Sequence, residues 1–107
     1  MPKYLLEVNY LDDGLKGLIK EGGTRRRAAA EKAVKSVGGS IESFYYAFGA
    51  ADVYVIADVP DNINAAALAL TLNASGAVAC RTTVLLTTED VDAAVKKHPK
   101  YRPPGKK

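Results

Sequence analysis

The sequence predicts an α+β fold in which four antiparallel strands form one sheet and two helices cover one of its faces. Four segments alternate apolar and polar residues with a period of two, as half-buried strands do. Two further segments carry apolar residues at helical spacing. The segments follow one another as strand, helix, strand, strand, helix, strand, and the length of 107 residues fits one domain.

The first predicted strand covers residues 4–10. One side of it carries Tyr4, Leu6, Val8 and Tyr10, and the other side carries Leu5, Glu7 and Asn9. Asp12-Asp13-Gly14 is expected to break the strand, and one short helical turn is expected before Gly22-Gly23.

The first long helix is predicted from an N-cap at Thr24 to about Val37. Its alanines and valines fall at helical spacing. Gly38-Gly39 closes it, because glycine adopts the left-handed conformation without steric cost.

The middle of the chain predicts a hairpin. The second strand is expected at residues 40–48, and Gly49-Ala50-Ala51 is too short for anything but a tight connection. The third strand is expected at residues 52–59, with a valine-rich face opposite Asp52, Tyr54, Ile56 and Asp58.

Pro60 ends the third strand, and Asp61 or Asn62 is expected to cap a helix that runs to about Ala74. A fourth strand is predicted at residues 77–87 and a short helix from Thr88 to Val95. This order describes two strand–helix–strand units joined by a hairpin, which is the ferredoxin-like plan. We expect one domain at residues 1–95 and a disordered basic tail at residues 96–107.

The charge is unevenly distributed. All 12 acidic residues precede the tail, which holds six of the 15 basic residues, so the body carries a formal charge of −3. An acidic body argues against a nucleic-acid-binding surface on the fold. The tail is interpreted as a solvated end, with weak contact to anionic partners as the alternative.

Cysteine content and hydropathy exclude several other classes. The single Cys80 cannot form an intrachain disulfide framework, and it is expected on the helix-covered side as a small apolar residue. No apolar run has the length of a signal peptide or of a membrane span. A cytoplasmic protein that inserts into no membrane is therefore expected. His98 is the only histidine, so no metal site is predicted.

The uncovered sheet face is the predicted ligand site. It is expected to combine Asp52 and Tyr54 with Glu7, Asn9, Arg81 and either Tyr46 or Tyr45. A mixed face of this kind is typical of an interface or a groove. A second copy packed on it would make a symmetric dimer and leave a tyrosine-lined cavity.

Each candidate side chain has a structural and a chemical interpretation. Asp52 either accepts backbone N–H bonds that fix the hairpin or acts as a general base. Arg81 either forms an ion pair with Asp52, Glu7 or a second subunit, or binds an anion. The run Arg25-Arg26-Arg27 spans most of a helical turn and forms either a solvated surface or an anion site.

Three features resemble the GYD-domain family of small bacterial and archaeal proteins. They are the opening strand with its glycine-containing turn and helix, the aromatic strand that runs through Phe48-Gly49 to Asp52, and the final strand with Arg81-Thr82-Thr83. Gly49 and Asp52 match the family motif, whereas Ala51 stands where the family usually has tyrosine. The resemblance covers residues 3–95 and implies a ferredoxin-like subunit of a dimeric α/β barrel.

The functional expectation is a homo-oligomer, at least a homodimer, that binds a small ligand without a cofactor. The alternative is a cofactor-independent enzyme, similar to the monooxygenases and isomerases among related dimeric barrels, that acts on an aromatic or carbonyl compound. In that enzyme Asp52 would be the base or orienting group, Arg81 the anion anchor and Tyr54 a hydrogen-bond donor. Fold analogy alone does not choose between these functions.

Overall fold

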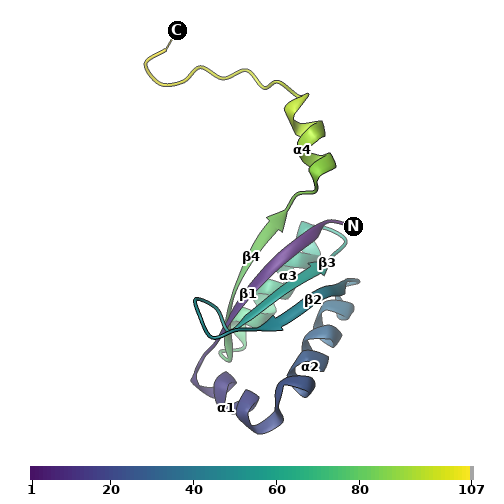
Figure 1. The fold of residues 1–107 in the computed structure, drawn as a ribbon, viewed down its shortest axis with the longest axis vertical. Coiled ribbons are helices and arrows are strands. Elements are labelled where there is room, and N and C mark those ends of the chain that lie inside the picture. Colours follow the sequence, from purple (N-terminus) through teal and green to yellow (C-terminus); the bar gives the residue numbers. More distant parts are fainter. Residues whose placement is uncertain (107) are drawn as a thin grey trace.

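The computed structural model describes residues 1–106 and has the predicted order of elements with one helix added (Figure 1). The elements are β1 (Lys3–Tyr10), α1 (Asp12–Glu21), α2 (Gly23–Ser36), β2 (Ser40–Tyr46), β3 (Val53–Asp58), α3 (Asn62–Ala74), β4 (Val78–Leu85) and α4 (Thr88–Val95). The strands form one antiparallel sheet in the order β2-β3-β1-β4. A strand of one strand–helix–strand unit therefore lies between the two strands of the other unit. The predicted α+β fold class is confirmed.

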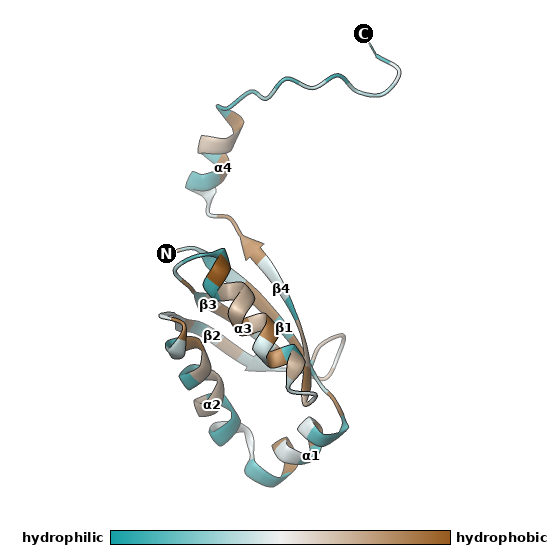
Figure 2. Cartoon of the chain, turned by 180° about the vertical axis from the view of Figure 1, so that it is seen from behind, coloured by the Kyte–Doolittle hydropathy of each residue, from teal (hydrophilic) through white to brown (hydrophobic). Residues whose placement is uncertain are grey.

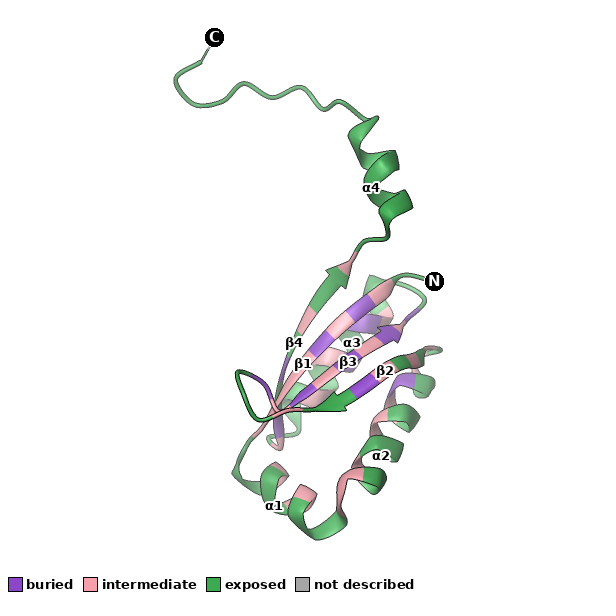
Figure 3. Cartoon of the chain, viewed as in Figure 1, coloured by how far each residue is buried: buried purple, intermediate pink, exposed green. Residues whose placement is uncertain are grey.

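The strand residues alternate between a buried face and a half-exposed face, as Figure 3 shows for β1 and β3. Leu6 lies opposite Val55, and Val8 lies opposite Val53, so the valine-rich side of β3 shares a face with the expected apolar side of β1. Both helices lie on this face. The predicted assignment of faces in β1 and β3 is confirmed.

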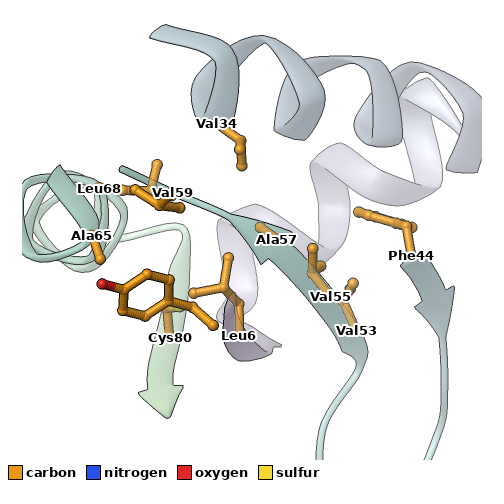
Figure 4. Packing of buried hydrophobic residues seen from close by; sticks show 11 residues of the cluster. Leu6, Val34, Phe44, Val53, Val55, Ala57, Val59, Ala65, Leu68 and Cys80 are labelled. Atoms are coloured by element: carbon orange, nitrogen blue, oxygen red, sulfur yellow. The ribbon is translucent and has the colours of Figure 1, made fainter. Parts of the chain in front are cut away.

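The core forms where α2 and α3 meet the sheet. α2 packs on the edge strand β2, and α3 packs on the opposite edge strand β4. Figure 4 shows Val34 of α2 and Leu68 of α3 directed toward the side chains of the strands. Asp61 is the cap of α3, because its Oδ1 accepts the N–H of Asn64 at 2.8 Å.

β1 ends at Tyr10, before Asp12-Asp13-Gly14, but the single helical turn expected after these residues is wrong, since a helix of 10 residues, α1, already begins at Asp12. Gly14 is a helical residue that lies against Ala77, the residue before β4. A Cβ at this position would overlap the carbonyl oxygen of Ala77, which also accepts the Leu11 N–H at 2.9 Å. Glycine is therefore required here for close approach of two backbones, which local sequence does not distinguish from a turn signal.

The start of α2 also differs from the expectation. The helix begins at Gly23, and no side chain caps it, so Thr24 is not an N-cap. The preceding Gly22 has φ 84° and joins α1 to α2. That positive φ, which glycine adopts without strain, lets the chain turn sharply from α1 into α2.

The strands near the hairpin are shorter than predicted. β2 ends at Tyr46, so Phe48 lies in the connection and is fully exposed. β3 begins at Val53 and β4 ends at Leu85. A register shift between Ile41 and Ser43 marks an irregularity in β2.

The C-terminal part projects from the body, as Figures 1 and 3 show. α4 has the predicted bounds and a capping box between Thr87 and Asp90, but every residue of α4 is exposed. The Cα radius of gyration is 17.2 Å. A compact chain of this length would have roughly 13 Å. Residues 96–106 contain no helix or strand, and the predicted tail ends at residue 107, which lies outside the described residues.

Candidate functional site

The uncovered face of the sheet brings together three of the predicted site residues in one row. Glu7 of β1 lies opposite Tyr54 of β3 on one side and opposite Arg81 of β4 on the other. Tyr45 of β2 extends the row, because it lies opposite Tyr54. The Nη2 atom of Arg81 lies 3.7 Å from Oε1 of Glu7, so Glu7 is the ion-pair partner of Arg81 within the chain.

This row adjoins an apolar centre and a second charged cluster. Leu5 and Ile56 lie opposite each other in the middle of the face and are only half-buried. At the end of the sheet, Lys3 Nζ lies 2.7 Å from Glu42 Oε1 and 2.9 Å from Asp58 Oδ1. The hydrogen bonds that Lys3 donates to Glu42 and Asp58 raise the pKa of Lys3 above its ordinary value. Asn9 lies at the other end of the face, opposite Ala79.

A cavity of about 180 Å³ lies on the other side of the sheet, between α2, α3 and the central strands. Figure 2 shows this side, where the two helices diverge over the sheet. We call this cavity the central cleft. The residues that line it are mostly apolar: Leu6, Val8, Tyr10, Arg26, Ala29, Ala30, Ala33, Val34, Ile41, Phe44, Val53, Val55, Leu68, Leu72 and Val78.

The central cleft has a simple cause. α2 makes its main strand contacts with β2 and α3 with β4, so the two helices leave a gap between them on this side of the sheet. The surface that α2 presents to the gap consists largely of Ala29, Ala30 and Ala33, whose methyl groups are too small to fill it. Close packing is the rule in protein interiors, so an apolar space of this size is a notable site for a ligand.

A second cavity of about 340 Å³ lies beside α1 and the β2–β3 connection. Tyr46, Phe48 and Asp52 contribute to its wall. Tyr10 lines both cavities, so they adjoin at the end of β1. The central cleft is thus apolar along the sheet and ends near two tyrosine hydroxyls and one carboxylate.

Asp52 has a clear structural function at this end. Its Oδ2 accepts the N–H of Tyr10 at 2.8 Å, and its own N–H donates to the carbonyl of Val8 at 2.9 Å. Its carbonyl accepts the N–H of Ala47 at 2.8 Å. Asp52 therefore connects the end of β1, the end of β2 and the start of β3, which agrees with the structural interpretation of this residue.

Tyr46 lies away from Tyr54. It belongs to the helix-facing side of β2, because it lies opposite the buried Val53. Its hydroxyl donates to the carbonyl of Gly23 at 2.7 Å, and its ring packs edge-on against Phe44 with the centroids 5.2 Å apart. Of the two tyrosines considered for the uncovered face, Tyr45 is the one that lies there.

The pKa of the Tyr46 hydroxyl depends on the groups at this end of the central cleft. Burial raises the pKa of its hydroxyl, and Tyr10 raises it further, whereas Arg26 and Arg27 oppose the rise. Tyr10, Arg26 and Arg27 are therefore near enough to Tyr46 to change the pKa of its hydroxyl. The sequence analysis placed Tyr10 on the correct face but did not consider it as a site residue.

The three consecutive arginines diverge, as their spacing predicts. Arg27 lies over the Phe44 ring at 5.6 Å and 3.8 Å from Glu31 Oε1. Arg26 lies 3.5 Å from Glu21 Oε2 and lines the central cleft, whereas Arg25 is exposed. The sequence contains a pattern that could have identified Arg26 as a site residue. Arg26 precedes the alanines of the cleft wall by three, four and seven positions, so it shares their helix face.

The motif residue Gly49 has no structural requirement for glycine, and Cys80 is a buried thiol. A Cβ added to Gly49 would meet no atom within 4 Å, and its φ is not positive, so the fold does not explain a glycine there. Cys80 is buried on the helix side as expected, and burial raises the pKa of its thiol, although Thr82 partly opposes this rise.

Within residues 1–106, no three metal-binding side chains come together in a way that could hold an ion. In that same part of the chain, none of the helices has both the length and the apolar character needed to cross a membrane.

Comparison with known proteins gives one match. The model of the GYD domain matches residues 4–95, which is most of the chain. Neither a curated protein nor a solved structure matches the chain. The matched range contains both cavities and the uncovered sheet face, and it ends with α4. The chain belongs to the GYD domain family.

Proposed function

We propose that the protein is a small-ligand-binding homodimer that holds its ligand in the central cleft. The observation that carries this proposal is the apolar cavity that α2 and α3 leave over the central strands. Ligand sites are typically concave, mostly apolar and supplied with a few polar groups that fix orientation. The central cleft has this composition, with Tyr10 and Arg26 as its polar members.

The uncovered face of the sheet supports the homodimer. Leu5, Ile56 and Tyr54 remain half-exposed there, and no helix of residues 1–106 covers them. A second copy placed on this face would bury them. In a symmetric contact, the same patch serves both subunits.

The projecting α4 also supports association. Val91 and Val95 are four positions apart and both exposed, so they form one apolar stripe on a helix of eight residues. Isolated helices of this length are only marginally stable in water. Packing of α4 on a second copy would provide the tertiary contact that its own body does not give.

A second candidate function is cofactor-independent catalysis on a small aromatic or carbonyl compound. It is favoured by the second cavity, because Asp52, Tyr10 and Tyr46 all line its wall. In this case Asp52→Asn would abolish turnover while the fold is retained.

The alternative location for a ligand is a pocket between two copies of the uncovered face. Its polar groups would be Tyr54, Glu7 and Arg81.

The location and source of the protein stay predictions. A cytoplasmic compartment is suggested by the single cysteine, since secreted domains of this size usually carry several disulfides. A bacterial origin is suggested by the family resemblance alone.

The ligand site can be tested by methyl NMR of the full chain during titration with a mixture of small aromatic and aliphatic compounds. Binding in the central cleft is expected to shift the methyl signals of Leu6 and Val53. Binding between two uncovered faces would instead shift those of Leu5 and Ile56. If neither pair of signals moves with any compound, the proposed ligand binding is wrong.

The homodimer is tested by light scattering. We expect a particle of twice 11.4 kDa. Ile56→Lys, which places a charge at the apolar centre of the uncovered face, is expected to reduce it to a monomer. Ala28→Lys on the exposed side of α2 serves as the matched control and should leave the mass unchanged. A wild-type monomer at micromolar concentration would contradict the proposal.

A further inference from the structure

The central cleft has one charged residue in its wall, and that residue is a cation. Arg26 reaches the cavity from the first turns of α2, while the rest of the wall is apolar apart from the Tyr10 hydroxyl. The Asp52 carboxylate lines the adjoining cavity, where it accepts the Tyr10 N–H at 2.8 Å. The wall of the cleft itself therefore carries one positive charge and no negative charge.

Arg26 is also incompletely satisfied by its own chain. Its Nη1 lies 3.5 Å from Glu21 Oε2, and the Arg26 and Glu21 side chains are 34% and 40% exposed. A contact of that length and exposure is weak. By contrast, Arg27 is held over the Phe44 ring at 5.6 Å, so its guanidinium has an aromatic partner. Arg26 is thus the arginine that can exchange its partner for a ligand.

We propose that the central cleft binds an amphiphile with an apolar body and a carboxylate, and that Arg26 binds the carboxylate. The apolar body lies along Leu6, Val53 and Leu68, and the carboxylate lies at the Tyr10 end. A guanidinium matches a carboxylate with two parallel N–H···O bonds, which a hydroxyl or an ammonium head group cannot accept. This inference depends on the proposed function, because it specifies the ligand of the same cleft.

The test compares three probes with the same apolar chain and different head groups: octanoate, octanol and octylammonium. Their dissociation constants are measured with the full chain by titration calorimetry, and methyl NMR of Leu6 and Leu68 locates each probe. Octanoate is expected to bind about tenfold more tightly than octanol, and octylammonium more weakly than either.

Charge variants separate the role of Arg26 from general basicity. Arg26→Gln is expected to weaken octanoate about tenfold and to leave octanol unchanged. Arg25→Gln removes the same charge from an exposed neighbour and is the matched control, with little effect on either probe. Glu21→Gln removes the competing carboxylate, so it is expected to strengthen octanoate by up to about fivefold. Ala33→Leu reduces the volume of the cleft and should weaken all three probes.

The outcomes distinguish this inference from the proposed function. Equal affinities for octanoate and octanol, or octanoate binding that survives Arg26→Gln, would overturn the anionic ligand class while the cleft stays a binding site. If no probe shifts the methyl signals of the cleft, both the inference and the proposed location of the ligand are wrong. Rescue of octanoate binding by Arg26→Lys to an intermediate affinity would support contact through charge together with guanidinium geometry.

Discussion

Removal of the Asp52 carboxylate should destabilise the fold, because three segments meet at this residue. In Asp52→Ala the N–H of Tyr10 loses its acceptor, which lies at 2.8 Å in the wild type. A polar group left without a partner costs about 1–3 kcal/mol when buried. Both residues are only half-buried, so we expect a loss of about 1–2 kcal/mol in the free energy of unfolding. The backbone bonds from Asp52 to Val8 and from Ala47 are kept, which is why the variant should still fold.

Asp52→Asn should have a smaller effect. The amide oxygen can still accept from Tyr10, and only the charge is lost. Charged acceptors contribute roughly 1 kcal/mol more than neutral ones, so about 0.5–1 kcal/mol is expected. The order of stability is therefore wild type, then Asp52→Asn, then Asp52→Ala.

Thermal denaturation and amide hydrogen exchange check this prediction. The Tm of Asp52→Ala should fall by roughly 4–10 °C, and the Tyr10 amide should exchange faster than its strand neighbours. Asp92→Ala on the exposed α4 is the control and should stay within about 0.5 kcal/mol of wild type. If Asp52→Ala matches the control and the Tyr10 amide keeps its protection, the structural role of the carboxylate is refuted.

Four further predictions concern three other residues: Asp61, Tyr4 and Cys80. Asp61→Ala removes the cap that accepts the Asn64 N–H and should cost about 1 kcal/mol in chemical denaturation, with α3 fraying first. Tyr4→Phe removes the hydroxyl that donates to Asn62 Oδ1 at 2.6 Å and should cost about 1 kcal/mol; no change in the denaturation midpoint would contradict this. Because burial raises the pKa of the Cys80 thiol, this thiol should react slowly with a disulfide reagent at pH 8 in the folded protein and rapidly in urea. The same raised pKa means that stability should decrease as the pH rises above the ordinary thiol value of about 8.5, where the unfolded chain releases the proton more easily.

Prediction from sequence succeeded where a local pattern has one dominant cause. The alternation in β1 and β3 depends only on which side chains face the helices, so the faces followed directly from the sequence. It failed at Gly14, where the glycine serves a contact with Ala77, more than sixty positions away. It also failed at Thr24, because α2 begins one residue earlier, at Gly23, and has no side-chain cap.

The candidate site shows the same division. Tyr54, Glu7 and Arg81 were predicted on one face, and the strand register does place them in one row. Tyr46 was assigned ambiguously, because the irregularity near Ser43 shifts the register of β2 and single-strand alternation cannot detect it. The central cleft was not predicted, although the alanines that form its α2 wall are visible in the sequence.

The sequence by itself determined the fold class, the order of elements and the buried side of the central strands, because periodicity and helix-ending residues act over a few positions. Only the tertiary structure decided that α2 and α3 pack on opposite edge strands and leave the central cleft, that Arg26 lines it, and that α4 projects from the body. The separation of two helices depends on side-chain volumes contributed by both helices and by the sheet. That sum cannot be obtained from any one segment of the chain.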